Sequence, residues 1–331
     1  MGAHVLANPA VRSNQLKAAS HVNRPKGRSM RRFHQRWQLA AVIITSMLSA
    51  LPATATPCLL PTTRSFTVTA AIDARTLQLD DGTALRLASI LPPTSYDSPP
   101  APADLPAEKA AIAALTKRVV GRNIAVSLER TTRDRYGRRV GSALLIGAGD
   151  RHHSALLEER WLQALAVHAG EARVALSAAI DTACASMLLR LEATAAAAKR
   201  GLWQLALYAV KRAEEPAGLL RYRSTFQIVR GTVARVAPSR NAVYLNFGDN
   251  WKRDFTARFD RAALKRANIN IAALKRLERH PVRIRGWIEK RNGPLITVWR
   301  PEQIELLQLT TTGDVVRFSP PRLLTELNSK Q

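Results

Sequence analysis

Residues Thr132 to Arg139 read Thr-Arg-Asp-Arg-Tyr-Gly-Arg-Arg, with four arginines and a single aspartate in eight positions. We refer to this stretch as the arginine turn, because Gly137 supplies the backbone freedom that a tight turn requires. Arg138 is then expected to enter a strand near Val140, where its rigid fork of donors can bind a phosphate group at two positions. A solvated basic turn is the simpler interpretation. The upstream Arg86 favours a phosphate site, since two arginines from separate strands can converge on one phosphodiester.

Alternation of apolar and polar residues predicts short β-strands on both sides of the arginine turn. Ala107 to Val120 instead has apolar residues at helical spacing, and two further helices, each closed by a glycine, follow the turn. This order predicts an α+β fold with an OB-like five-stranded barrel and packed helices. The expected strands are residues 66–72, 77–79, 84–90, 124–128 and 140–146, and the two later helices are 156–168 and 183–199.

Five segments in this region resemble a thermonuclease, or staphylococcal-nuclease-like, domain spanning residues 64–210. They are Ala71–Leu77, Leu85–Pro93, Arg135–Arg138, Ala164–Val174 and Ala198–Trp203. Their order and spacing make the resemblance more specific than any one segment. The resemblance implies a calcium site built from carboxylates, a carboxylate that activates water, and two arginines that clamp the phosphate.

The calcium ligands of that family are largely replaced in this sequence. The family's Asp-Gly-Asp-Thr becomes Asp73-Ala74-Arg75-Thr76, and its Asp-Thr-Pro-Glu becomes Leu91-Pro92-Pro93-Thr94. A calcium ion takes six to eight oxygen ligands, carboxylates among them. Because Arg75 and Leu91 stand at ligand positions and Asp73 alone remains, we expect the calcium site to be lost and no cofactor to be bound.

The catalytic carboxylate is also missing, whereas both clamping arginines match, as Arg86 and Arg138. Thr94 occupies the position of the catalytic glutamate, and a threonine hydroxyl cannot accept a proton from water near neutral pH. The domain is therefore interpreted as a degenerate thermonuclease-like phosphodiesterase that does not cleave by the family mechanism. A rearranged catalytic site is the alternative. Its candidate groups are Asp80, Asp81 and Asp97, better explained as solvated turn residues, and the adjacent His152 and His153.

Residues 211–222 are expected to form a linker, and residues 223–309 a second, β-rich barrel-like domain, followed by a polar tail at 310–331. The second domain is similar to the C-terminal module often appended to exported bacterial nuclease-like proteins, through Tyr244–Gly248, Asp254–Thr256 and Arg285–Trp287. An Asn292-Gly293 pair predicts a hairpin, and Asp260 is expected to cap a helix broken near residues 268–270.

Ten of the 18 aromatic residues lie after residue 220, among 22 Lys and Arg. Aromatic rings beside cations are typical of single-strand binding surfaces, although barrels also need aromatic core residues. Trp251, followed by Lys252 and Arg253 in an expected turn, is the preferred stacking residue over Trp287, which lies in an apolar strand. With the arginine turn, the predicted nucleic-acid-binding residues are Arg86, Arg135, Tyr136, Arg138, Trp251, Lys252 and Arg253.

The N-terminal region has the order of a secretory signal peptide. Arginines at 31, 32 and 36 precede a thirteen-residue apolar run at 39–51, and small residues follow at 53–55. The run is too short to span a bilayer comfortably. Residues 1–55 are therefore predicted to direct export to the periplasm or the extracellular space and to leave no integral membrane span after cleavage; an uncleaved anchor or a buried helix are the alternatives. Export would favour a Cys58–Cys184 disulfide over two free thiols.

The net charge of +25 arises from 50 Lys and Arg against 25 Asp and Glu, and predicts attraction to polyanions. Residues 57–220 carry 20 bases and 16 acids, whereas residues 221–331 carry 22 bases and nine acids. The C-terminal third is therefore expected to contribute more of the affinity. Three functions remain open: binding of nucleic acid or another polyanion without cleavage, phosphodiester cleavage at a rearranged site, and an envelope interaction module.

Overall fold

The computed structural model describes residues 57–97, 105–147, 156–307 and 322–323. The expected signal segment, His152 and His153, and most of the polar tail lie outside the described residues. The described residues belong to one compact unit, Ala55–Gln331. Among them, no helix has the length and apolar character needed to cross a membrane.

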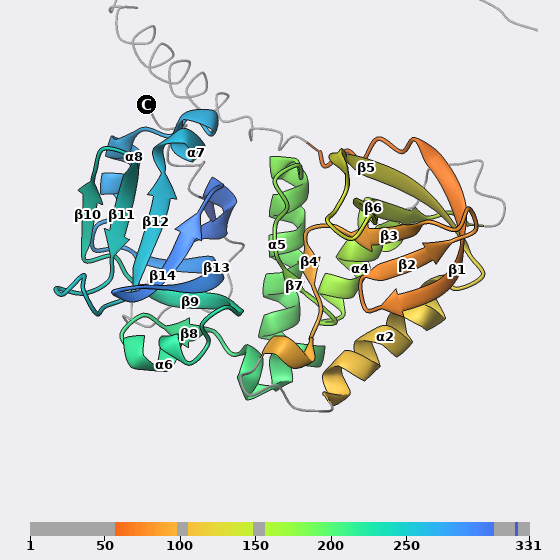
Figure 1. The fold of residues 1–331 in the computed structure, drawn as a ribbon, viewed down its shortest axis with the longest axis horizontal. Helices are drawn as coiled ribbons and strands as arrows, with labels where there is room; N and C mark the ends of the chain where they lie inside the picture. Colours follow the sequence, from red (N-terminus) through yellow and green to blue (C-terminus); the bar gives the residue numbers. More distant parts are fainter. Residues whose placement is uncertain (1–56, 98–104, 148–155, 308–321, 324–331) are drawn as a thin grey trace, which may run out of the picture. The chain divides into compact units, whose positions relative to one another are not determined.

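A closed five-stranded barrel, in the order β1-β2-β3-β6-β5, forms the first domain (Figure 1). Its neighbours pair antiparallel except β3 with β6, which run parallel. The predicted OB-like barrel is thereby confirmed. The strands are β1 Arg64–Asp73, β2 Thr76–Leu79, β3 Ala84–Leu87, β5 Asn123–Arg133 and β6 Arg139–Leu145.

Helix α2, Pro106–Val119, packs against β1, and α4, Leu162–His168, packs against β6 and α5, Thr182–Ala197 (Figure 1). The single helix predicted at 156–168 is divided at Trp161, because this fully buried residue adopts extended backbone and bridges to Leu144. The short helix α3, Leu157–Arg160, precedes it. Strand β4, Ile90–Leu91, pairs with β7, Arg173–Val174, beside the barrel, and 3-10 helices lie at Ser95–Asp97, Gly201–Gln204 and Ala206–Tyr208.

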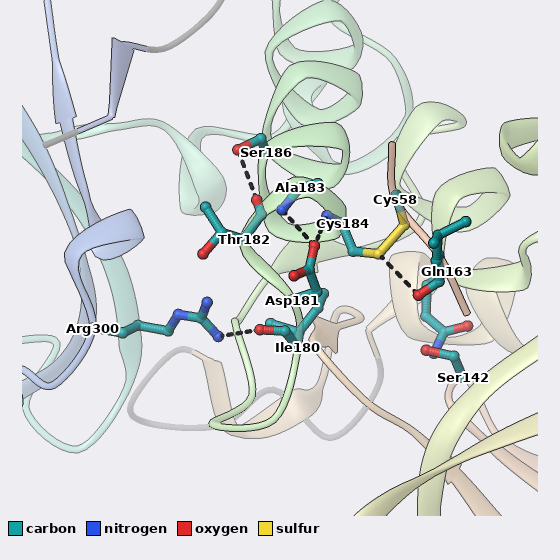
Figure 2. Close-up of a disulfide and its surroundings, with 11 residues drawn as sticks. Cys58, Ser142, Gln163, Ile180, Asp181, Thr182, Ala183, Cys184, Ser186 and Arg300 are labelled. Atoms are coloured by element: carbon teal, nitrogen blue, oxygen red, sulfur yellow. Dashed lines mark hydrogen bonds between the residues drawn. A yellow bond between two sulfur atoms is a disulfide. The ribbon is translucent and has the colours of Figure 1, made fainter. Parts of the chain in front are cut away.

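A disulfide between Cys58 and Cys184 joins the start of the described chain to α5, with the two Cα atoms 4.5 Å apart (Figure 2). Both cysteines are buried in the core of the barrel domain. The carboxylate of Asp181 caps the same helix, accepting from the N–H of Ala183 at 2.7 Å and of Cys184 at 3.3 Å. The start of α5 is thus fixed both covalently and by a cap.

A second sheet, in the order β10-β11-β12-β14-β13-β15-β16, forms the second domain and encloses its own core; β9 also pairs with β13, and β8 pairs with β9. This agrees with the predicted second β-rich domain. The strands are β8 Lys211–Arg212, β9 Phe226–Thr232, β10 Arg235–Pro238, β11 Ala242–Asn246, β12 Thr256–Asp260, β13 Pro281–Arg291, β14 Gly293–Val298, β15 Ile304–Leu306 and β16 Arg322–Leu323. A 3-10 helix at Pro301–Gln303 precedes β15.

The segment expected as a linker, 211–222, is structured. Strand β8 pairs with β9, and helix α6, Pro216–Leu220, places Leu219 in the second core. The helix expected after β12 is divided into α7, Arg261–Arg266, and α8, Ile271–Lys275. Asp260 makes no side-chain cap and pairs with Arg258 instead, while Asn270 caps α8 by accepting from the N–H of Ala273 at 2.7 Å.

Buried polar contacts join the two domains. Arg285 of β13 is 1 % exposed; it lies 2.7 Å from the carboxylate of Glu192 on α5 and donates to the Val174 carbonyl at 3.1 Å. Arg300 also donates to the first domain, to the Ser177 carbonyl at 2.6 Å and to the Ile180 carbonyl at 3.1 Å, the latter drawn in Figure 2. Since removing one partner of a buried ion pair leaves an uncompensated charge, these contacts hold the second domain in one position on the first.

Candidate anion-binding cleft

A cleft of about 580 Å³ lies between the barrel and the second domain. We call it the interdomain cleft. One wall carries cationic side chains from the barrel, and another carries two tryptophans from the second domain. Its lining residues are Arg75, Arg86, Ala88, Ser89, Ile90, Leu91, Glu129, Arg133, Asp134, Val140, Ala175, Leu176, Ser177, Ala178, Trp287 and Trp299.

The arginine turn is organised around Asp134. One carboxylate oxygen, Oδ1, accepts from the backbone N–H of Tyr136 at 3.0 Å and of Arg138 at 3.1 Å. Gly137 has a φ of +77°, which favours glycine and lets its N–H reach the Asp134 carbonyl at 2.9 Å. The sequence predicted this turn and its glycine correctly, but it gave no role to the aspartate.

The two predicted clamp arginines converge on the other oxygen of that carboxylate. Arg86 Nε lies 3.1 Å from Asp134 Oδ2, and Arg138 approaches the same atom with Nε at 2.9 Å and Nη2 at 2.8 Å. Burial alone would raise the pKa of Asp134, but the hydrogen bonds from Arg138 and Tyr136 and the charge of Arg138 lower it to about 2. The carboxylate is therefore ionised at neutral pH and orients both guanidiniums.

The two arginines are not equivalent toward the cleft. Arg138 does not line it, and its Nη1 donates to the Thr76 hydroxyl at 3.4 Å. Arg86 lines the cleft and uses only Nε on Asp134, so its two terminal nitrogens have no hydrogen-bond partner among the described residues. Arg86 is thus the member of the pair that can bind an anion directly.

Arg75 adds a further cation to the cleft wall. Its Nη1 donates to the Ile90 carbonyl at 3.4 Å, and its N–H donates to Asp73 Oδ1 at 2.8 Å. Burial and the nearby charge of Arg86 lower the pKa of Arg75, although Asp73 opposes this effect. Crowded guanidiniums of this kind repel one another, and an anion between them would relieve the repulsion. The sequence identified Arg75 only as a replaced ligand.

The other replaced positions have structural roles. Leu91 is 5 % exposed and packs with Phe226 and Ile228 of the second domain. Thr94 does not line the cleft, and its N–H donates to Asp97 Oδ2 at 3.1 Å. Among the described residues, no three His, Cys, Asp or Glu side chains gather closely enough to hold a metal ion.

The aspartates considered for a rearranged site lie elsewhere. Asp97 is 5 % exposed, lies 3.0 Å from Arg173 and accepts from the Tyr208 hydroxyl at 3.0 Å, so its interpretation as a solvated turn residue was wrong. Asp80 is exposed, and Asp81 is held by Arg139 at 2.8 Å outside the cleft.

The carboxylate that does line the cleft beside Asp134 is Glu129, which the sequence analysis missed. The Ser177 hydroxyl donates to Glu129 Oε1, and the Ser89 hydroxyl donates to Ser177 Oγ at 3.0 Å. Ser89 is buried with a φ of +64°, a strained backbone region for a serine. No sequence signal marked this group, because its members are separated by up to 88 residues.

The predicted aromatic and basic residues are divided between the cleft and other surfaces. Tyr136 is 65 % exposed, with Arg135 Cζ 4.8 Å from its ring centre, and neither residue lines the cleft. Trp251 is 57 % exposed in the turn before β12, with Lys252 Nζ 5.8 Å from its ring, and it also lies outside the cleft. Arg253 is exposed in the same turn. The structure therefore does not bring this turn to the arginines.

Trp287 differs most from expectation. It was placed inside an apolar strand, yet it is 54 % exposed and lines the cleft with Trp299, which is 37 % exposed. The strand is apolar on one face only. The signal that would have shown this is the alternation of Arg283, Arg285, Trp287 and Glu289 with apolar or small residues.

Comparison with known protein families matches residues 84–205 to the family described as staphylococcal nuclease homologue. This segment extends from β3 into the 3-10 helix Gly201–Gln204 and includes Arg86, Leu91, Thr94 and the arginine turn. A search of curated proteins finds no match to the chain.

Proposed function

The chain contains a staphylococcal-nuclease-like domain, and from this premise we propose that it is an exported protein that binds nucleic acid through the interdomain cleft and its basic second domain, without calcium-dependent cleavage. The observation that carries the proposal is the cleft itself. Arg75, Arg86 and Arg133 line it against the carboxylates of Glu129 and Asp134. The lining is net cationic, and oriented guanidiniums suit phosphate.

The second domain supplies further positive charge. Exposed Lys and Arg residues lie on α7, on and just after α8, and in the turn before β12. A protein with this surplus of positive charge attracts polyanions at long range. The exposed residues include Lys252, Arg253, Arg261, Lys265, Arg266, Lys275 and Arg279.

The residues at the family's calcium and base positions support the absence of the inherited mechanism. Leu91 is buried against an apolar surface, and the Asp73 carboxylate already accepts from Arg75 and from the Thr76 hydroxyl at 2.8 Å. Arg75 adds a positive charge where the family has a ligand. These residues do not fit a calcium ion, which prefers several carboxylate oxygens, and Thr94 is not a base.

Export is supported by two independent features. The sequence before residue 56 has the order of a secretory signal, and Cys58 and Cys184 form a disulfide. Disulfides persist in oxidising compartments and are rare in the cytosol of most cells. The periplasm or the extracellular space is therefore the proposed location.

The test is a titration of the intact protein with a fluorescently labelled oligo(dT), repeated over a range of salt concentrations. Log affinity should fall linearly with log salt, and Arg86→Ala should reduce the slope by about 0.7 if Arg86 binds one phosphate. Arg139→Ala is the matched control, because Arg139 pairs with Asp81 outside the cleft. Affinity that is independent of salt, or equal slopes for Arg86→Ala and the parent, would overturn the proposal.

Equal affinity for oligo(dT) and for inorganic polyphosphate would instead favour an envelope interaction module, which needs charge alone.

A second candidate function, metal-independent phosphodiester cleavage, has one observation in its favour: the Glu129 carboxylate lines the same cleft as Arg86. Incubation of single-stranded DNA and RNA with the protein, with and without calcium, separates the two. Cleavage that disappears in Glu129→Gln would establish the enzyme and end the non-catalytic interpretation.

A further inference from the structure

Strand β13 presents two different faces. Val282, Ile284 and Ile288 point into the core of the second domain. The alternate residues Arg285 and Trp287 therefore share the opposite face, which is the face that meets the barrel domain. Arg285 is buried there against Glu192, whereas Trp287, two residues further, reaches the interdomain cleft.

Trp287 packs against a buried residue of its own domain. Its ring meets Phe226 edge-on, with ring centres 6.1 Å apart and planes at 78°. The Phe226 carbonyl in turn accepts from Arg173 Nη1 at 2.6 Å, and Arg173 is 2 % exposed. Trp287 is 54 % exposed and already packs against a buried neighbour, so part of the cost of ordering its ring for a planar ligand is met in advance.

Trp299 is fixed by a separate set of contacts. The backbone N–H of Trp299 donates to Gln303 Oε1 at 3.0 Å, and Gln303 Nε2 donates to the Arg285 carbonyl at 2.9 Å. The backbone of Trp299 is thus linked through Gln303 to Arg285, and Trp287 follows Arg285 by two residues on the same strand. Both tryptophans also line a second, smaller cavity of about 210 Å³, which shares Ala175 and Leu176 with the interdomain cleft.

The chemistry of the cleft changes from one wall to the other. Guanidiniums on the barrel side bind phosphate, and exposed indole rings on the other side stack on planar bases. A volume of about 580 Å³ lies within the range of small-ligand sites, roughly 300–1,000 Å³, and accommodates a nucleotide unit. A duplex keeps its bases stacked on one another, so only an unpaired base can use these rings.

We propose that the interdomain cleft binds single-stranded nucleic acid, with a base stacked on Trp287 and Trp299 and an adjacent phosphate bound by Arg75 and Arg86. This inference rests on the proposed function and adds to it the ligand class and the residues that read the base. It also assigns the appended domain a direct part in the site, because the barrel domain alone supplies no exposed aromatic ring to the lining of this cleft.

The experiment compares two labelled ligands of equal charge, an oligo(dT) of about ten nucleotides and an abasic oligomer of the same length. The intact protein should bind oligo(dT) more tightly, by roughly 5- to 150-fold for each stacked base, as base–aromatic stacking predicts. Trp287→Ala and Trp299→Ala should each reduce the ratio of the affinity for oligo(dT) to that for the abasic oligomer, and Trp287→Phe should retain part of this ratio. The affinity for the abasic oligomer and its salt slope should stay unchanged in all three.

Trp251→Ala is the matched control, since Trp251 is a comparably exposed tryptophan of the same domain outside the cleft; its ratio should equal that of the parent. Urea denaturation of each variant checks folding. Equal binding of both oligomers by the parent, with an Arg86-dependent slope, would overturn this inference and leave the proposed function standing. A ratio retained in both cleft variants but lost in Trp251→Ala would move the stacking site to the turn before β12. Absence of salt-sensitive binding to either oligomer would end both proposals.

Discussion

Replacing Asp134 by asparagine should separate the structural role of this carboxylate from its electrostatic role in the cleft. The folded protein lowers the pKa of Asp134 from 3.8 to about 2, and each unit corresponds to about 1.4 kcal/mol. The ionised carboxylate therefore contributes roughly 2–2.5 kcal/mol to the free energy of unfolding at neutral pH. For a chain of this size, Asp134→Asn should lower Tm by roughly 3–5 °C.

The pH dependence has a definite sign. Because the folded-state pKa is the lower one, the contribution of Asp134 is fully present above about pH 4 and is lost as the pH falls toward 2. Urea denaturation of parent and variant should show a stability difference that is constant near neutral pH and shrinks in that acidic window. Asp81→Asn is the control, since it removes an aspartate that also pairs with an arginine but is more exposed; its effect should be smaller.

Asp134→Asn should strengthen polyanion binding, although it lowers the stability of the protein. Removal of the carboxylate frees Arg86 and Arg138 and raises the charge of the site by one, so polyanion affinity at low salt should increase and the salt slope should steepen by up to about 0.7. A variant that is as stable as the parent would refute the stability argument. Unchanged or weakened binding by the folded variant would refute the claim that Asp134 competes with phosphate.

Three further predictions concern the disulfide, the domain interface and calcium. Changing Cys58 and Cys184 to serine opens a loop with a sequence separation of 126 and should lower the free energy of unfolding by about 5 kcal/mol in the chain-entropy model. Urea denaturation of the parent, with and without reductant, and of the variant measures this loss. Equal urea midpoints for the parent and the variant would contradict it. Arg285→Met removes the arginine partner of buried Glu192 and leaves Glu305 paired with Arg283 alone, so it should cost about 3–5 kcal/mol; a loss below about 1 kcal/mol would show that the interface tolerates separation. Millimolar calcium should leave both Tm and oligonucleotide integrity unchanged, and a calcium-dependent rise in Tm would reveal a site that the replaced ligands do not predict.

The sequence predicted the barrel, the arginine turn and the second β-rich domain because these depend on local patterns: alternation along strands, a glycine at a tight turn, an Asn-Gly hairpin. It failed where a residue's role depends on partners far along the chain. Leu91 was predicted as a lost ligand, but its contact with Phe226 follows only from the docking of two domains. Trp287 was assigned to a strand interior because the strand was judged by its apolar content and not by the polarity of each face.

The same dependence on tertiary contacts explains why a leucine suits position 91. A carboxylate at position 91 would be buried against Phe226 and Ile228, and an ionised group buried without a partner is strongly unfavourable. Leucine removes that charge and adds apolar contact with the second domain, which in turn holds Trp287 at the cleft. The burial of Leu91 and the position of Trp287 at the cleft thus both depend on the same docking of the second domain. Leu91→Asp would therefore be expected to weaken the domain interface, because it would bury an ionised group against Phe226 and Ile228.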